Sequence, residues 1–252
     1  MKVIFNGSLI ENTDEMFSQE GWLKGSGFFE TIKTVDGHPW ALSRHMRRAV
    51  NSARTLGFRL PNEEVVRGCV SQILQLNNFE QGMMRISFSS NGDWGIFHTP
   101  YQEKNNPASV TVFSHEIVEE GVPLKTYPYS HRLEILREVN SKGFDEAIVI
   151  NQMNKVCEGS VTNLLFKIDG TWITPPLSDG VLPGVMRALV IENLEVQVRS
   201  ITVQEIPRVE SGFLLSSLRI AQPISAIEGR ELIHSHEFEA EIRAMALRTS
   251  VG

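Results

Sequence analysis

EAIVINQMNKVCEGSVTNLLFKIDGTWITPPLSDGVLPGVMR, residues Glu146–Arg187, is the stretch that decides the fold. Its short apolar runs, several rich in β-branched residues and separated by polar turns, predict two consecutive β-hairpins. Asp169-Gly170, the turn of the second hairpin, is a dipeptide typical of such turns. The expected strand pairs are Glu146–Asn151 with Val156–Ser160, and Asn163–Ile168 with Thr171–Thr174.

The same stretch ends in the entrance to a helix. Gly180–Arg187 (GVLPGVMR) opens an apolar helical run, and a glycine before a helix leaves backbone N–H groups able to hold an anion. Glu158, beside Gly159-Ser160, adds a carboxylate. This combination predicts a cofactor that is anionic at one end and cationic at the other.

Composition limits the class of protein. The 252 residues suffice for one large or two modest domains, and 41% hydrophobic residues fit a soluble globular protein. The net charge of −6 disfavours a nucleic-acid partner. The N-terminus turns polar too early for a signal peptide, and no apolar run reaches membrane-span length. Cys69 and Cys157 lack metal-like spacing, so we expect reduced thiols, no metal site and a cytoplasmic protein.

The rest of the chain mixes strands with helices, which predicts an α/β protein in two subdomains. Ser43 is the expected N-cap of a helix that runs to Leu56 and stops at Gly57, and Asn62 begins another that runs to Leu76. The polar stretch Asn91–Pro107 predicts a surface loop. Further expected elements are an opening hairpin with an Asn6-Gly7 turn, a domain connection at His115–Pro123, and helices at His131–Ser141, Val185–Leu194 and Glu237–Leu247.

Three motifs taken together, DEAIVIN (Asp145–Asn151), VCEGSVTNLLF (Val156–Phe166) and GVLPGVMR (Gly180–Arg187), resemble the class IV, fold-type IV family of pyridoxal 5′-phosphate (PLP) enzymes. That family includes branched-chain and D-amino-acid aminotransferases and aminodeoxychorismate lyase. The resemblance covers nearly the whole chain. It implies a smaller N-terminal α/β domain (1–115), a C-terminal barrel-like domain (121–252), PLP at their junction, and a homodimer.

The resemblance assigns roles at both ends of the cofactor. Glu158 matches the family glutamate that keeps the pyridine nitrogen protonated, although a solvated turn glutamate is the alternative. Arg48, in His45-Met46-Arg47-Arg48-Ala49, matches the arginine that holds the phosphate, although Ala49 departs from the usual leucine and a solvated helix face is the alternative. The backbone N–H groups of Val185 and Met186 would complete the phosphate site.

Small polar residues extend the implied site. Ser160, Thr162 and Asn163 would support the cofactor, unless they serve only as turn residues. Ser216 and Ser217, in LLSSLRIAQPI, resemble the family loop near phosphate and substrate, or else simply end a strand. Phe29, in GSGFFET, matches the aromatic residue beside the substrate, or else belongs to the core.

Lys125 is the candidate for the Schiff-base lysine, because Lys125-Thr126-Tyr127-Pro128-Tyr129 fits the family pattern K-T-x-x-Y at the expected distance before Asp145. Only Pro123 and Leu124 separate it from Gly121-Val122, where the family has a strand and a loop. Either that segment is shortened, or Val122–Tyr127 is itself the strand and Lys125 carries a solvated amine.

These features favour a PLP-dependent lyase that acts on a small amino substrate, eliminating pyruvate from 4-amino-4-deoxychorismate to give 4-aminobenzoate. The GVMR form around Met186 and the phenylalanine at position 29 both resemble the lyases more than the aminotransferases. Two alternatives stay open. One is a D- or branched-chain amino-acid aminotransferase, and the other is a PLP-binding relative that lacks the Schiff-base lysine.

Overall fold

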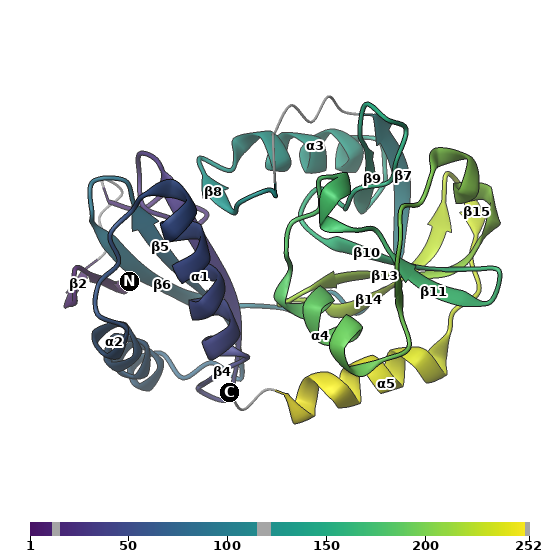
Figure 1. The fold of residues 1–252 in the computed structure, drawn as a ribbon. Helices are drawn as coiled ribbons and strands as arrows, with labels where there is room; N and C mark the ends of the chain where they lie inside the picture. The colour runs from purple at the N-terminus through teal and green to yellow at the C-terminus, as the bar shows by residue number, and fades with distance from the viewer. Residues whose placement is uncertain (12–15, 115–121, 250–252) are drawn as a thin grey trace. The chain divides into compact units, whose positions relative to one another are not determined.

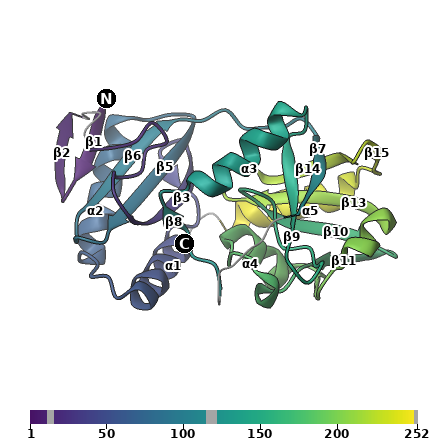
Figure 2. The same ribbon diagram turned by 90° about the horizontal axis from the view of Figure 1, so that it is seen from above.

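The computed structural model describes residues 1–11, 16–114 and 122–249, so most of the connection expected at His115–Pro123 lies outside the described residues. The chain forms two compact units, drawn in Figures 1 and 2. The first comprises Met1–Glu103 and Leu124–Tyr129, and the second comprises Lys104–Pro123 and Ser130–Thr249. None of the helices in the described ranges is long and apolar enough to cross a membrane.

The first unit is an antiparallel sheet in the order β2-β1-β6-β5-β3-β4, with β8 paired to β3 and with helices α1 and α2 packed on it. The strands are β1 (Lys2–Phe5), β2 (Ser8–Glu11), β3 (Gly27–Val35), β4 (His38–Pro39), β5 (Gln81–Ser89), β6 (Trp94–Pro100) and β8 (Thr126–Tyr127). The helices are α1 (Leu42–Leu56) and α2 (Glu63–Leu76).

Local sequence explains most boundaries of this unit. The opening hairpin is confirmed, and α2 begins after Asn62, whose side chain accepts a hydrogen bond from the Glu64 N–H at 2.8 Å. The predicted Ser43 cap is wrong. Helix α1 begins at Leu42, two residues earlier than predicted, after a left-handed Ala41, and the Ser43 hydroxyl instead accepts a hydrogen bond from Arg67 at 3.0 Å.

Strand β6 overturns the centre of the surface loop predicted at Asn91–Pro107, whereas residues 101–107 form a loop as predicted. The strand lies between β1 and β5, and Trp94 and Ile96 belong to the hydrophobic core of the unit. Gly95 is required there, because a Cβ would meet the Phe17 ring at 2.6 Å. The glycine that suggests a loop in the sequence is therefore a response to close packing.

The second unit is a mixed sheet in the order β12-β11-β10-β13-β14-β7-β9, with β15 paired to β14. Its strands are β7 (Ala108–Ser114), β9 (Glu146–Ile150), β10 (Asn163–Ile168), β11 (Thr171–Thr174), β12 (Gln197–Val198), β13 (Val209–Ser216), β14 (Ile220–Ile227) and β15 (Arg230–Glu231). Its α-helices are α3 (Ser130–Ser141), α4 (Val185–Asn193) and α5 (His236–Arg248), and short 3₁₀ helices span Leu177–Asp179 and Val203–Arg208.

Both predicted hairpins are present in this unit. A bridge between Ile150 and Val156 closes the first, and β10 pairs with β11 in the second. Strand β10 is buried between β11 and β13, so the loop just before it, Gly159–Thr162, rests on a rigid part of the sheet. The predicted α/β class is confirmed.

Candidate active site

Glu158 is a buried carboxylate with a polar partner on each of its oxygens. Its Oε2 accepts hydrogen bonds from Asn163 Nδ2 and from the Leu182 N–H, both at 3.0 Å. Its Oε1 pairs with Arg132 Nη2 at 2.7 Å. Glu158 is 5% exposed, so the alternative of a solvated turn glutamate does not hold. A carboxylate fixed in this way can accept a hydrogen bond from a cationic ring nitrogen.

The N-terminus of α4 lies beside this carboxylate. Its N-cap, Gly184, makes no side-chain capping hydrogen bond. A Cβ at Gly184 would overlap Asn163 Oδ1, and Asn163 Nδ2 donates to the Leu182 carbonyl at 3.0 Å. Asn163 therefore fixes both Glu158 and the approach to α4. The Val185 and Met186 side chains are buried in the core, so only their backbone N–H groups are suited to an anion.

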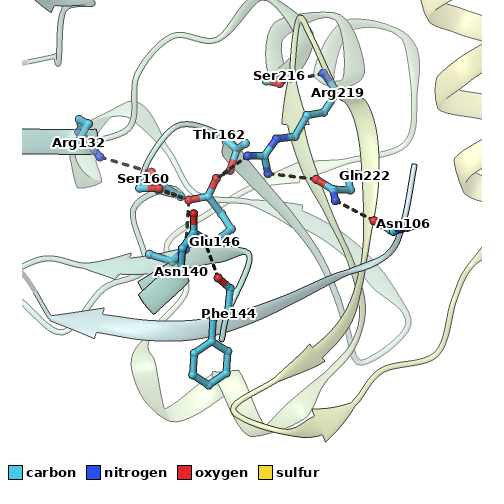
Figure 3. Close-up of polar contacts among 12 residues, drawn as sticks. Asn106, Arg132, Asn140, Phe144, Glu146, Ser160, Thr162, Ser216, Arg219 and Gln222 are labelled. Carbon is cyan, nitrogen blue, oxygen red and sulfur yellow. Dashed lines mark hydrogen bonds and ion pairs between the residues drawn. The ribbon is translucent and has the colours of Figure 1, made fainter. Parts of the chain in front are cut away.

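A buried cluster around Glu146 holds the loop that follows Glu158 (Figure 3). Glu146 Oε1 accepts hydrogen bonds from the Ser160 N–H at 2.9 Å and from the Ser160 hydroxyl. Glu146 Oε2 accepts one from the Thr162 hydroxyl at 3.4 Å. The hydroxyl protons of Ser160 and Thr162 thus point to Glu146, and both residues act by shaping the loop.

Arg219 connects this cluster to the second hydroxyl-rich loop. Its Nη2 lies 3.3 Å from Glu146 Oε2, its Nη1 donates to Gln222 at 3.1 Å, and its backbone N–H donates to Ser216 Oγ at 3.1 Å (Figure 3). Arg219 is 6% exposed and Glu146 is fully buried. This ion pair anchors the turn that carries Ser216 and Ser217.

In the first unit, Arg48 is held by a buried carboxylate. Arg48 donates to Glu30 through Nε at 2.8 Å and Nη2 at 2.6 Å, and His45 Nδ1 lies 2.6 Å from Glu30 Oε2. Burial raises the pKa of Glu30, but Arg48 and His45 outweigh it and lower that pKa to about 2. Burial lowers the pKa of His45, which favours the neutral form of its imidazole. The Arg48 guanidinium is therefore fixed in position, and two of its nitrogens, Nε and Nη2, already donate to Glu30.

Lys125 lies immediately before the short strand β8, so Val122–Tyr127 is not a full strand. Its carbonyl accepts a hydrogen bond from the Phe29 N–H at 2.9 Å. Its ammonium lies 4.8 Å from the Phe29 ring centroid and 4.9 Å from that of Tyr129. The amine thus lies over two aromatic faces, which favours a partly desolvated cation over a solvated strand lysine.

Arg85 is a charged residue of this unit that none of the sequence motifs includes. Its guanidinium lies 5.1 Å from both the Trp22 and the Phe29 ring centroids, and burial lowers its pKa to about 10. Its Nη1 donates to the Glu20 carbonyl, while Nε is buried without a hydrogen-bond partner among the described residues. The sequence feature that could have indicated a functional role is a single arginine inside the apolar strand β5.

Each unit thus contains part of the predicted set. The second unit brings together Glu158, Asn163, Val185 and Met186, with Ser160, Thr162 and Ser216 tied to the Glu146 cluster. The first unit contains Arg48, Lys125 and Phe29. The sequence motifs do not predict their partners, which are Glu30, His45, Arg85, Arg132, Glu146 and Arg219.

The sequence profile of the family described as amino-transferase class IV matches residues 27–227, and the chain belongs to this family of enzymes. The aminodeoxychorismate lyase of Bacillus subtilis (strain 168) is 23% identical over 258 residues, covering 90% of this chain and 86% of the relative. The D-alanine aminotransferase of Bacillus licheniformis is 21% identical over 258 residues, covering 92% and 90%.

Solved structures agree with this assignment. The branched-chain aminotransferase from Thermoproteus uzoniensis, crystallised with norvaline, superposes with a TM-score of 0.85 at 26% sequence identity. The superposition covers 100% of this chain and 96% of that one. The relatives thus include both lyases and aminotransferases at comparable identity.

Proposed function

We propose that this chain is a PLP-dependent lyase that converts 4-amino-4-deoxychorismate to 4-aminobenzoate and pyruvate. The observation that carries the PLP assignment is the buried Glu158 carboxylate, held by Asn163 and by the Leu182 N–H beside the uncapped N-terminus of α4. The sequence relative of Bacillus subtilis and the phenylalanine at position 29 favour the lyase reaction.

The residues present fit the cofactor. A phosphate needs N–H donors, and Val185 and Met186 supply backbone N–H groups after a glycine that no side chain could replace. A guanidinium fork suits the same group, and Arg48 is the candidate. A cationic pyridine ring needs an anionic acceptor, which Glu158 supplies.

In the proposed reaction, PLP supplies an electron sink for the substrate carbon that bears the amine. Lys125 would hold the cofactor covalently until the substrate amine replaces it, and its freed amine would then remove the proton from that carbon. Glu158 keeps the proton on the ring nitrogen. With that one proton removed, the bond from the neighbouring ring carbon to the enolpyruvyl oxygen would break and leave the ring aromatic, and the released enolpyruvate would take up a proton to become pyruvate.

Arg85 is a candidate for binding a carboxylate of the substrate. Arg85 is half-buried and its Nε has no hydrogen-bond partner among the described residues, and a carboxylate matches a guanidinium fork. Trp22 and Phe29 flank the guanidinium and would contact the substrate ring beside it.

The test is an assay of purified, PLP-loaded protein with 4-amino-4-deoxychorismate, in which 4-aminobenzoate and pyruvate are both measured. We expect the two products in equal amounts, and we expect Lys125→Ala to abolish their formation. Wild-type protein that binds PLP yet forms no 4-aminobenzoate would exclude the lyase.

An aminotransferase acting on D- or branched-chain amino acids is the second candidate, favoured by the relatives with those activities. It predicts conversion of the bound cofactor to its amine form on addition of an amino acid, with reversal by a 2-oxo acid. Absorbance spectra of the loaded protein before and after each addition distinguish it from the lyase.

A third candidate is a PLP-binding relative without the covalent lysine. Borohydride reduction followed by peptide mass mapping tests it, because PLP fixed on Lys125 excludes this reading. We also propose that the protein is cytoplasmic and forms a homodimer. Sedimentation velocity of the purified protein is the direct test of the dimer.

A further inference from the structure

Arg132 forms an ion pair with Glu158, and the proposed mechanism gives Arg132 no role. It lies in the first turn of α3, with its side chain 14% exposed. Its Nη2 contacts Glu158 Oε1 at 2.7 Å, and its Nη1 lies 3.5 Å from the Gly159 carbonyl. Glu158 Oε2 is occupied by Asn163 and by the Leu182 N–H, so three donors share one buried carboxylate.

We propose that Arg132 is a positioning residue that sets how firmly Glu158 holds the proton on the cofactor ring nitrogen; this inference rests on the proposed function. A guanidinium stays charged at any working pH, so Arg132 neutralises part of the negative charge of Glu158 at every such pH. A carboxylate with part of its charge neutralised is a weaker partner for a second cation. Arg132 therefore weakens the electron sink that Glu158 alone would maintain.

The packing of α3 does not depend on this contact. Ile135 and Val139 bury the apolar face of α3 against Ala147 and Val149 of strand β9. Replacing Arg132 should therefore change the charge at Glu158 and leave the helix in place. Arg137 is exposed on the same helix and provides a control for the loss of one positive charge.

The experiment uses full-length protein loaded with PLP labelled with ¹⁵N in the ring. The pH midpoint of the ring-nitrogen NMR shift is measured in wild type, Arg132→Gln, Arg132→Lys and Arg137→Gln. We expect Arg132→Gln to raise the midpoint by about one unit, a tenfold change in proton affinity. The Arg132→Lys and Arg137→Gln variants should stay close to wild type.

A purely structural role for Arg132 would weaken PLP binding without moving the midpoint, and that result overturns the inference. An unchanged midpoint with unchanged affinity overturns it as well. If Arg132→Gln does not fold, the comparison of Arg132→Lys with Arg132→Met decides, because only the latter lacks the charge. Failure of the wild-type protein to bind PLP would refute the proposed function itself.

A separate group of side chains, at the start of α5, has the composition of a metal site. One nitrogen each from His234 and His236 and one oxygen from Glu239 lie within 4.8 Å of one another, and in the absence of an ion His234 Nε2 and Glu239 Oε2 share a hydrogen bond of 2.6 Å. Arg243 Nε holds the other Glu239 oxygen at 2.8 Å, and backbone hydrogen bonds at Leu232 and Ile233 fix the segment before His234. Secondary contacts that orient the ligands are typical of metal sites.

We also propose that His234, His236 and Glu239 bind one divalent transition-metal ion of the zinc class. Two imidazoles and a carboxylate are ligands that Zn²⁺ accepts, leaving a fourth position for water. The ion would join the residues before α5 to the first turn of that helix. Since the imidazoles must be neutral to bind, affinity should fall as pH is lowered.

Calorimetric titration of untagged protein with Zn²⁺ tests this second proposal. We expect one site per chain, at least tenfold weaker in His234→Gln and in His236→Gln, and unchanged in His38→Gln, a matched control in the first unit. Absence of binding, or equal binding in all four proteins, would overturn the proposal.

Discussion

At the scale of single residues, Cys157 is the clearest case of burial controlling chemistry. It is fully buried, and its Sγ lies 2.8 Å from the Asp179 carbonyl oxygen. Burial, with the nearby charges of Glu158 and Asp179, raises the pKa of its thiol to about 12. The thiolate, which is the nucleophilic form, is therefore scarce near neutral pH. Despite its position beside Glu158, Cys157 is unsuited to a nucleophilic role.

We predict that Cys157 in native Cys69→Ser protein reacts with a thiol reagent at pH 8 about a thousandfold more slowly than a free cysteine. The measurement is the rate of colour release from a chromogenic disulfide, with guanidinium-unfolded protein as the reference for full reactivity. Burial also raises the pKa of Cys69, so this thiol in the wild type should also react more slowly than a free cysteine. A native rate similar to the unfolded rate would contradict the burial argument.

The residue types of the candidate site could be predicted from the sequence, but most of their partners could not. Glu158 and Asn163 lie within one motif, so their proximity follows from a short loop. Glu146 and Arg219 belong to distant parts of the chain, and their ion pair depends on the order of strands in the sheet. For this reason the sequence could place Ser160 in the loop expected to support the cofactor, but could not predict its hydrogen bond to Glu146.

At the scale of elements, nothing in the structure requires a glycine at position 68. It lies inside α2, has ordinary helical backbone geometry, and an added Cβ would meet nothing within 4 Å. We predict that Gly68→Ala raises the free energy of unfolding by about 0.5–1 kcal/mol, measured by urea denaturation. Gly57→Ala is the contrasting variant, because the C-cap of α1 has φ of 70° and should be destabilised by alanine.

At the entrance to α4, replacing a glycine by alanine should destabilise the protein, in contrast to the replacement of Gly68. An alanine at Gly184 would overlap Asn163 Oδ1, so Asn163 must move and lose its bonds to Glu158 and Leu182. We expect Gly184→Ala to lower the free energy of unfolding by about 1–3 kcal/mol. In an Asn163→Ala background the same change should cost much less, and a double-mutant cycle by urea denaturation measures the difference. Additive effects would show that the two residues do not compete for space.

Elements with their own periodic pattern were predictable, and those defined by close packing were not. Helix α2 follows from its cap and its apolar face. Strand β6 was missed because Gly95 and Pro100 are typical of loops, yet Gly95 is there to admit the Phe17 ring. The cap of α1 was missed because a left-handed alanine has no side-chain signal in the sequence.

At the scale of the whole molecule, the dependence of stability on pH reflects the buried charges. Glu30 has a pKa of about 2 in the folded chain, far below the value of 4.5 for an unperturbed group. Its contribution is therefore present above pH 4.5 and is lost as pH falls toward 2. For a shift of this size in a buried group the contribution is about 3 kcal/mol. His45, whose pKa burial lowers, acts in the same direction from about pH 6.5 downward.

We therefore predict that the free energy of unfolding decreases steadily as pH is lowered from 7 to 3, measured by urea denaturation at each pH. Glu30→Gln removes the carboxylate that Arg48 and His45 share, so it should cost about 3 kcal/mol at pH 7 and flatten the curve below pH 4.5. Glu63→Gln is the control, because Glu63 forms an exposed pair with Arg67 and should leave the curve unchanged. If Glu30→Gln kept the full acid dependence, the Glu30 cluster would not be its source.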